Sequence, residues 1–517
     1  MTETYSSLNR IAQSAGLNMI AQVLIRAFSF LINAIIIRFV SIDYIGIVNV
    51  RLHLLVTTIL FITREPIRKA CFDKKSEEWS SVNRLVWLVI PIGIVVATVL
   101  SLIWIYVLPS PDIDFYNESV IIYAIASLIA LSSESCFVIT QLSLHTNIKV
   151  FVESTALTIR SLLNCVLLGL WPSLGLKGFC IAELIFACLY PSLYIVKINQ
   201  ILRDTPKESS LPIQSLRDLA PSFHSGSFPE GSVSLLFLFF RQSCLKQLLT
   251  EGEKYILSLS SVSMHDQGVY EIVNNLGSLF ARFLFQPLEE AFYLFFSREG
   301  DRGKSQNQSI LSVCALLLRS LNYFGCLVIG FGMSYSSSLL FLYGGSSLAS
   351  PTAIFMLRLY CVYVLVLGQN GISEAFFMAT AESSLLEQYN RLMGIYSGVF
   401  VGVALLLTPI LGSAGYIVAN IVNMICRCAH HGLYLNRVSE KKIWRDILPD
   451  GRWLGCLIIV SSLLCMSENR SFPYSIHSLL CHLSVGIVAG ISMLGLLYVF
   501  DRKLIREDMK ILRNKQE

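Results

Sequence analysis

Charged side chains interrupt several long apolar segments of this chain, and they are the residues whose types and spacing could do chemistry. The clearest case is the stretch RQSCLKQLLTEGEKYILS, residues 241–258, which follows the apolar run GSVSLLFLFF. An ionisable residue near the middle of a membrane costs about 2.5–3.5 kcal/mol on insertion scales, so it tends to face a cavity, a partner or the bundle interior. Five cations lie deep enough in such segments to line an interior: Arg26, Arg51, Arg241, Lys246 and Arg282.

This set of cations indicates a phosphate-containing ligand, because a guanidinium group binds two phosphate oxygens at once and an ammonium group adds a point charge. An alternative is that each cation is neutralised inside the protein, for example Arg282 by Glu289, two helical turns further on. The fourth and fifth apolar segments also carry the charges of Glu134, Glu153 and Arg160. For any single residue the sequence leaves both roles open.

The sequence lacks the patterns that are typical of enzymes and metal sites. The GKS tripeptide at 303–305 has Arg298 where a phosphate-binding loop needs a glycine. No G-x-S-x-G or H-E-x-x-H pattern occurs, and the 14 cysteines include no C-x-x-C pair. We therefore expect no enzyme activity, no cofactor, no metal site and no nucleic-acid partner.

The composition indicates a helical membrane protein. Of the 517 residues, 54% are hydrophobic and 15% are charged, whereas soluble domains carry about 25% charged residues. A membrane-crossing helix needs about 20 mainly apolar residues. On that basis we predict an all-α polytopic membrane protein with about 14 transmembrane helices. The predicted spans are 16–39, 45–63, 85–108, 119–142, 152–170, 174–196, 230–250, 267–297, 309–334, 350–378, 388–410, 412–434, 453–467 and 474–500.

The loop charges predict the orientation of the chain in the membrane. An even number of spans places both termini on one side, and Lys and Arg mark the cytosolic side. With both termini cytosolic, the opposite loops carry only Lys177, Lys254 and Arg470, and the remaining loop cations are cytosolic. The N-x-S sequons at Asn117 and Asn469 then fall in lumenal loops and are glycosylation candidates.

The longest polar connection suggests a molecule built from two halves. We predict an N-terminal six-helix lobe over 1–196, a cytosolic linker over 197–229 and a C-terminal six-helix lobe over 230–434. Residues 435–517 then hold a basic cytosolic loop, helices 13 and 14 and a cytosolic tail. Two lobes around a central cleft form a known transporter architecture, in which one lobe rocks against the other.

Three blocks of sequence carry a resemblance to a known family. They are residues 28–71, which end in TREPIRKAC, residues 245–298, which contain EGEKYILS and QPLEEAF, and residues 342–379, which contain GQNGISEAF. Together they resemble the "requiring fifty-three" family of endoplasmic-reticulum proteins, in the multidrug/oligosaccharidyl-lipid/polysaccharide flippase superfamily. Two positions depart mildly from the family pattern, since Lys254 stands where Arg is often found and Gln369 where a small residue is commoner.

The resemblance implies a function in N-glycosylation. It implies transport of Man5GlcNAc2-diphospho-dolichol from the cytosolic to the lumenal leaflet of the endoplasmic reticulum, with this lipid and the membrane lipids as partners. The family blocks point to Arg26, Arg38, Arg51, Arg64, Glu65, Arg68, Glu251, Glu253, Asn274, Arg282, Glu289, Glu290, Asn370 and Glu374.

We expect the five deep cations to meet the diphosphate of this lipid. The candidates for gating or structural charge pairs are Arg64, Glu65, Arg68, Glu251, Glu253, Lys254, Glu289, Glu290, Asn370 and Glu374. Two alternatives stay open on the sequence. One is a factor that assists the dolichol-linked pathway without moving the lipid, and the other is an ion-coupled exporter of small molecules.

Overall fold

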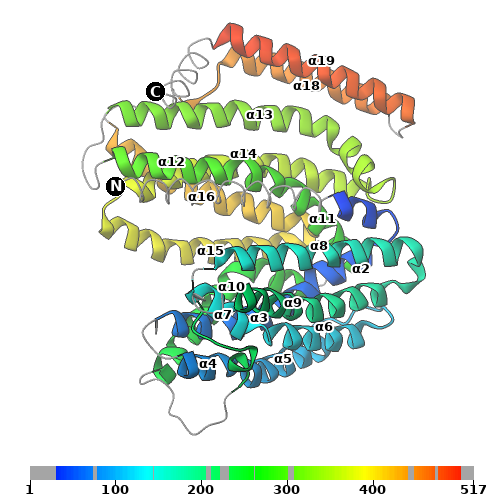
Figure 1. Ribbon diagram of the computed structural model, residues 1–517. Helices are drawn as coiled ribbons and strands as arrows, with labels where there is room; N and C mark the ends of the chain where they lie inside the picture. Colours follow the sequence, from blue (N-terminus) through cyan, green and yellow to red (C-terminus); the bar gives the residue numbers. More distant parts are fainter. Residues whose placement is uncertain are drawn as a thin grey trace. The chain divides into compact units, whose positions relative to one another are not determined.

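The structure is a computed structural model with a wholly helical framework over the residues it describes (Figure 1). Those residues are 31–73, 79–143, 145–204, 211–221, 232–260, 262–300, 308–439, 447–471 and 475–501. Within these ranges ten helical segments are long and apolar enough to cross a membrane. The predicted fold class, an all-α protein with many membrane spans, is therefore confirmed.

The helices coincide with the predicted spans. Within the described ranges, every predicted span from 45–63 onward overlaps a helix, whereas the first predicted span and Arg26 lie mostly or wholly outside those ranges. Several helices in predicted spans are more polar and are not among the ten, so the number fourteen stays a prediction. These helices are α10 (Ser232–Leu259), α11 (Met264–Phe280), η4 (Ala281–Phe285), α12 (Gln286–Glu299) and α16 (Ala414–Val438).

Contacts between residues divide the chain into two compact units, Met1–Gly268 and Val269–Glu517. In the first unit, α3 (His53–Asp73) packs against α5 (Val89–Tyr106), α6 (Tyr116–Leu131) and α10. The other described helices of this unit are α2 (Ile42–Gly46), η1 (Ile47–Leu52), α4 (Trp79–Trp87), α7 (Glu134–Leu142), α8 (Thr146–Leu170), η2 (Pro172–Leu174), α9 (Leu176–Asp204) and η3 (Leu216–Leu219). Because α10 packs with the first unit, this division differs from the predicted lobe boundary, and the two-lobe arrangement stays a prediction.

The first unit is apolar both inside and on its outward faces. Leu54, Leu55 and Ile59 of α3 are fully buried, while Val95 and Leu102 of α5 are more than half exposed. Lipid tails are as apolar as these side chains, so burial alone does not hold membrane helices together. Close packing of small residues and internal polar contacts must do so.

Two glycines in the first unit let backbones approach closely. A Cβ atom on Gly46 would lie 2.2 Å from the carbonyl oxygen of Met264, and one on Gly268 would lie 2.3 Å from that of Ile42. Neither position can accept a side chain without displacement of backbone. α2 is therefore seated directly on the first turn of α11.

We expect Gly46→Ala to lower the melting temperature of the detergent-solubilised protein, because overpacking at a backbone contact costs about 1–3 kcal/mol. Gly169→Ala in α8 is the matched control, since nothing lies within 4 Å of a Cβ atom there. Alanine favours a helix over glycine, so the control should melt at the same temperature or higher. Equal melting temperatures for the two variants would contradict the packing at Gly46.

The second unit is built around α14 (Pro351–Thr380). This helix starts with the Ser350 hydroxyl accepting a hydrogen bond from the Ala353 amide at 3.2 Å, and with Pro351 in its first turn, where proline is well tolerated. It packs against α12, α16 and α13 (Gln308–Gly344), and α15 (Ser383–Leu411) packs on α16. A terminal pair, α18 (Gly451–Ser471) and α19 (Ile476–Phe500), lies along α13 (Figure 1).

The terminal pair is tied to the rest of the second unit by buried acids. Glu468 of α18 is 2.9 Å from Arg358 of α14, and Asp501 beyond α19 is 2.6 Å from Arg319 of α13. Tyr323 also donates to Asp501 at 2.9 Å.

An apolar cavity of about 630 Å³ lies among side chains of α11, α13, α14 and α19.

The described part of the predicted linker, residues 211–221, packs into the first unit. Leu211, Ile213 and Leu219 are buried in a core cluster of that unit. The carboxylate of Asp218 accepts hydrogen bonds from the backbone amides of Ser215 at 3.0 Å and Gln214 at 2.9 Å. These backbone hydrogen bonds hold the pKa of Asp218 below its usual value.

We expect the contribution of Asp218 to stability to be constant between pH 5 and pH 8. A carboxyl group whose pKa is lowered on folding stabilises the fold above its ordinary pKa of about 3.9, and this is lost as the pH falls through the lowered value. Asp218→Asn should therefore lower the melting temperature by the same amount across that range, with convergence only under more acidic conditions. A gap between variant and wild type that changes from pH 6 to pH 8 would contradict this.

Candidate functional site

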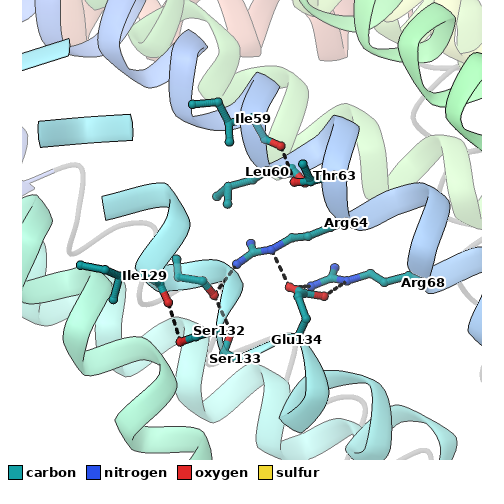
Figure 2. A network of polar contacts seen from close by, with 10 residues as sticks. Ile59, Leu60, Thr63, Arg64, Arg68, Ile129, Ser132, Ser133 and Glu134 are labelled. Atoms are coloured by element: carbon teal, nitrogen blue, oxygen red, sulfur yellow. Dashed lines mark hydrogen bonds and ion pairs between the residues drawn. The ribbon is translucent and has the colours of Figure 1, made fainter. Parts of the chain in front are cut away.

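The fourth apolar span is broken into two helices at Ser132 and Ser133. α6 ends at Leu131, and α7 begins at Glu134. The Ser132 hydroxyl donates to the Ile129 carbonyl at 2.6 Å, and the Ser133 hydroxyl donates to the Ala130 carbonyl at 2.8 Å (Figure 2). Serine side chains that bond their own backbone compete with the helix, which explains the break. Both serines keep helical dihedral angles, so this is a local interruption within one span.

Two arginines from α3 meet at this break. Figure 2 shows Arg64 and Arg68, one helical turn apart, both directed at the carboxylate of Glu134. Arg68 binds both carboxylate oxygens, at 2.7 Å and 2.8 Å, and Arg64 lies 2.5 Å from one of them. Arg64 also donates to the Ala130 carbonyl at 2.9 Å, at the end of α6. We call these three charged residues the arginine clamp.

The arginine clamp is enclosed and carries one excess positive charge. The side chain of Glu134 is 2% exposed, and those of Arg64 and Arg68 are 14% and 20% exposed. Arg68 lies over the ring of Phe137 at 3.5 Å from its centroid. Burial makes this cluster strongly dependent on each member, since removal of one partner leaves an uncompensated charge.

A second, looser cluster lies beside the clamp on α3 and α10. Glu65 is 3.5 Å from both Lys69 and Lys246, and Lys246 lies over the ring of Phe61 at 5.4 Å. The side chain of Lys246 is 55% exposed. We call Glu65, Lys69 and Lys246 the lysine cluster. Since the distances are long and the residues accessible, each contact contributes about 0–1 kcal/mol and exchanges easily.

Arg51 is enclosed inside the first unit. Its residue is fully buried, and its guanidinium group donates to the backbone carbonyls of Pro109 and of Ser258, the latter at 3.2 Å. Its own carbonyl accepts from the Trp104 indole at 3.0 Å. Among the described residues, no acidic side chain forms an ion pair with it. This geometry favours a structural role at the end of α10, and contact of Arg51 with a diphosphate stays a prediction.

The remaining predicted cations are placed unevenly. Arg241 is exposed on α10 and lines a surface cavity of about 370 Å³ with the aromatic ring of Phe237. Arg282 lies in η4, and its side chain, like Arg26, is outside the described part of the structure. Of the acids on α10, Glu251 pairs with Lys254 at 3.1 Å, and Glu253 is half-buried.

The predicted residues of the second unit gather around α14. Asn370 donates to Glu374 at 2.9 Å, and Tyr389 donates to its other oxygen at 3.2 Å. The carboxylate of Glu289 rests on Gly371, where a Cβ atom would lie 1.7 Å from it.

Two further predicted residues of this unit have local partners. Glu290 accepts from Gln286 at 3.0 Å, and Asn274 accepts from Tyr360 at 2.9 Å. The glycosylation candidates Asn117 and Asn469 are both exposed near helix ends.

Glu134 is the site residue to which the sequence assigned no role. A signal for it exists, because it is the only charge within the predicted span 119–142. Its partners, however, lie 66 and 70 residues earlier in the chain, and only the packing of α3 on α6 and α7 brings them together.

The chain is similar to known proteins over nearly its whole length. A family model described as Rft protein, Rft-1, matches residues 10–511. The Man(5)GlcNAc(2)-PP-dolichol translocation protein RFT1 of Mus musculus is 35% identical over 96% of both chains. The protein of the same name from Xenopus tropicalis is 36% identical over 95% of this chain and 94% of its own. That of Saccharomyces cerevisiae is 26% identical over 96% and 95%.

Two solved structures share the fold. The lipid II flippase MurJ in an inward closed conformation has a TM-score of 0.60 at 14% identity and covers 95% of this chain and 99% of its own. An inward-facing multidrug resistance MATE family transporter has a TM-score of 0.54 at 13% identity, over 80% and 95%. At these identities the likeness shows the fold alone. The family resemblance of the three sequence blocks is nevertheless confirmed by the family match and the relatives, and the chain belongs to the Rft protein family.

Proposed function

We propose that this chain moves the dolichyl-diphosphate-linked oligosaccharide Man5GlcNAc2-PP-dolichol from the cytosolic to the lumenal leaflet of the endoplasmic reticulum. The observation that carries the proposal is the 35% identity over 96% of the chain to a relative named for translocation of this lipid. The multi-span helical fold is of the kind that a lipid transporter needs. In this proposal both termini are cytosolic, and the process has no covalent step.

The charges of the first unit suit a diphosphate ligand. The arginine clamp and the looser cluster beside it together hold four cations, Arg64, Arg68, Lys69 and Lys246, against two acids, Glu65 and Glu134. A diphosphate that leaves water needs counter-charge, because an isolated charge in an apolar medium pays a large desolvation cost. The excess positive charge of these two clusters supplies it.

The two clusters have different roles in the proposal. Lys246 is half exposed and weakly paired, so the diphosphate can displace Glu65 and bind it. The arginine clamp is tight and enclosed, so it fixes the broken helix at the edge of the binding region. Arg241, also exposed on α10, adds a second accessible cation. Arg26 and Arg282 belong to the proposed set on their sequence positions alone.

The predicted two-lobe division supplies the movement. Lobes at 1–196 and 230–434 would rock about the bound headgroup and expose it to one leaflet and then the other. The dolichyl chain stays in the lipid throughout, so only the polar headgroup crosses the apolar core. Acidic residues on and beside α14, including Glu289 and Glu374, are the proposed members of ion pairs that break when the cleft opens and re-form when it closes.

The proposal is tested by depleting the protein from cells that depend on it and locating the lipid in sealed microsomes. We expect Man5GlcNAc2-PP-dolichol to accumulate in the cytosolic leaflet, where an impermeant reagent that oxidises sugar diols can reach it. Lipid that reaches the lumenal leaflet at the normal rate while proteins are under-glycosylated would contradict the proposal. That result would favour the accessory role instead.

A further inference from the structure

Residues 211–221, which we call the strap, accept hydrogen bonds from three side chains on one face of α4. Trp79, Asn83 and Trp87 stand four residues apart on α4, so they lie on one face of that helix. The two indole N–H groups donate to the strap, Trp79 to the Asp218 carbonyl at 3.0 Å and Trp87 to the Leu219 carbonyl at 2.9 Å. Trp79, Asn83 and Trp87 are the first, fifth and ninth residues of the sequence WSSVNRLVW.

Asn83 joins the strap to α7. Its amide donates to the carbonyls of Asp218 at 3.2 Å and Ala220 at 3.0 Å, and its oxygen accepts from the Ser135 hydroxyl at 2.5 Å. Ser135 also lies 3.2 Å from the Leu219 carbonyl. Asn83 and Ser135 are almost fully buried, so these bonds form away from water, where an unmade bond is costly.

Ser135 is the residue that follows Glu134 in the first turn of α7. Two sets of contacts therefore hold that turn, one at each of these two adjacent residues. The arginine clamp holds Glu134 through α3, and the strap with α4 holds Ser135. At Ser132 and Ser133 the backbone keeps helical dihedral angles, but the two N–H groups bond carbonyls only three residues earlier. The side-chain contacts therefore add to the backbone in fixing the position of this turn.

We propose that the strap is a positioning element for the arginine clamp, with Asn83 and Ser135 as its positioning residues. The strap fixes the first turn of α7 and thereby holds Glu134 between Arg64 and Arg68. A change in the position of the linker between the two predicted lobes would then change the position of Glu134 in the fourth span. Its consequence for transport rests on the proposed function, whereas its effect on α7 does not.

Cysteine labelling tests the position of α7 without any transport assay. Cys136, next to Ser135, is 5% exposed, and Cys314 in the second unit is fully buried. We expect Asn83→Ala to raise the rate of maleimide labelling at Cys136 at least tenfold, measured by mass spectrometry, while Cys314 stays unlabelled. Arg84→Ala is the matched control, because the Arg84 side chain bonds Ser81 of its own helix and should leave Cys136 protected.

A double-variant comparison tests the link to the clamp. If the strap positions Glu134, the fall in melting temperature for Asn83→Ala combined with Glu134→Gln should be clearly smaller than the sum of the two single falls. Trp87→Phe, which removes one hydrogen bond to the strap and keeps an aromatic ring, replaces Asn83→Ala if that variant does not fold. Strictly additive falls, or unchanged labelling of Cys136, would overturn the proposal.

The transport consequence is measured separately. Asn83→Ala in vesicles should slow headgroup transfer at least tenfold with little change in the lipid concentration that gives half-maximal rate. A wild-type protein that moves no lipid would overturn the proposed function and leave the labelling result as the test of the strap. Normal transfer by an Asn83→Ala protein with labelled Cys136 would overturn the proposed consequence of the strap for transport.

Discussion

Glu134→Ala should destabilise the protein more than any other single replacement of a charged residue described above. It leaves Arg64 and Arg68 largely buried with no acid between them, and breaking a buried ion pair in this way costs about 3–5 kcal/mol. For a unit of this size, each kcal/mol shifts the melting temperature by about 2–4 °C. We therefore expect a fall of at least about 6 °C for the detergent-solubilised protein.

The control for this prediction is Glu65→Gln on the same helix. Glu65 pairs with two lysines at 3.5 Å and is partly exposed, so its loss should cost less than about 1 kcal/mol. Replacing Arg68 by Met in the Glu134→Gln background should recover part of the stability, because it removes one of the unpaired charges. Equal melting temperatures for Glu134→Ala and Glu65→Gln would contradict the enclosed clamp.

Lys246→Gln should reduce transport strongly while leaving the fold intact. A hydrogen bond to a charged group contributes about 1.5–3 kcal/mol, which corresponds to about 10-fold to 150-fold in rate or affinity. The side chain is 55% exposed and its ion pair with Glu65 is long, 3.5 Å, so the melting temperature should stay within about 2 °C of wild type. The measurement is the initial rate of headgroup transfer in vesicles.

Lys197→Gln is the matched control for Lys246→Gln. Lys197 also lies over an aromatic ring, that of Phe151 at 4.3 Å, but on α9. It should transfer the lipid at the wild-type rate. A Lys246→Gln protein that transfers the lipid as fast as this control would remove Lys246 from the proposed diphosphate site.

The helices could be predicted from the sequence because membrane spans depend on local composition. Runs of about 20 apolar residues can be recognised directly, and the predicted spans 85–108 and 350–378 overlap the helical segments 79–106 and 351–380 almost completely. Helix ends were harder. α9 runs to Asp204, eight residues beyond its predicted span, because the part of a helix that extends past the apolar core of the membrane need not be apolar.

The partners of the charged residues could not be predicted, since they depend on which helices pack together. Glu289 rests on Gly371 of α14, a contact that its sequence position does not indicate, while its predicted pairing with Arg282 stays a prediction because the Arg282 side chain lies outside the described part of the structure. Lys246 and Glu65 are 181 residues apart and meet only because α10 packs on α3. Arg51 carries the same sequence signal as Lys246 but is fully buried, and periodicity does not distinguish a cavity from a packed interface.

The contacts of the linker could not be predicted from the sequence either. Its polar composition predicts a solvated connection, but three of its apolar residues, Leu211, Ile213 and Leu219, are buried against α4 and neighbouring helices. The indoles and amide that hold it lie more than 130 residues earlier in the chain. Side-chain bonds to an irregular backbone leave no periodic trace in a sequence.

The central claim is tested most directly by purified protein in lipid vesicles that contain Man5GlcNAc2-PP-dolichol in both leaflets. A membrane-impermeant oxidant of sugar diols reports the fraction of headgroups that reach the outer face. With the wild-type chain we expect oxidation to continue until nearly all of the lipid has reacted, while Lys246→Gln vesicles should lag far behind. Oxidation that stops at the outer-leaflet share, as in vesicles without protein, would contradict the account.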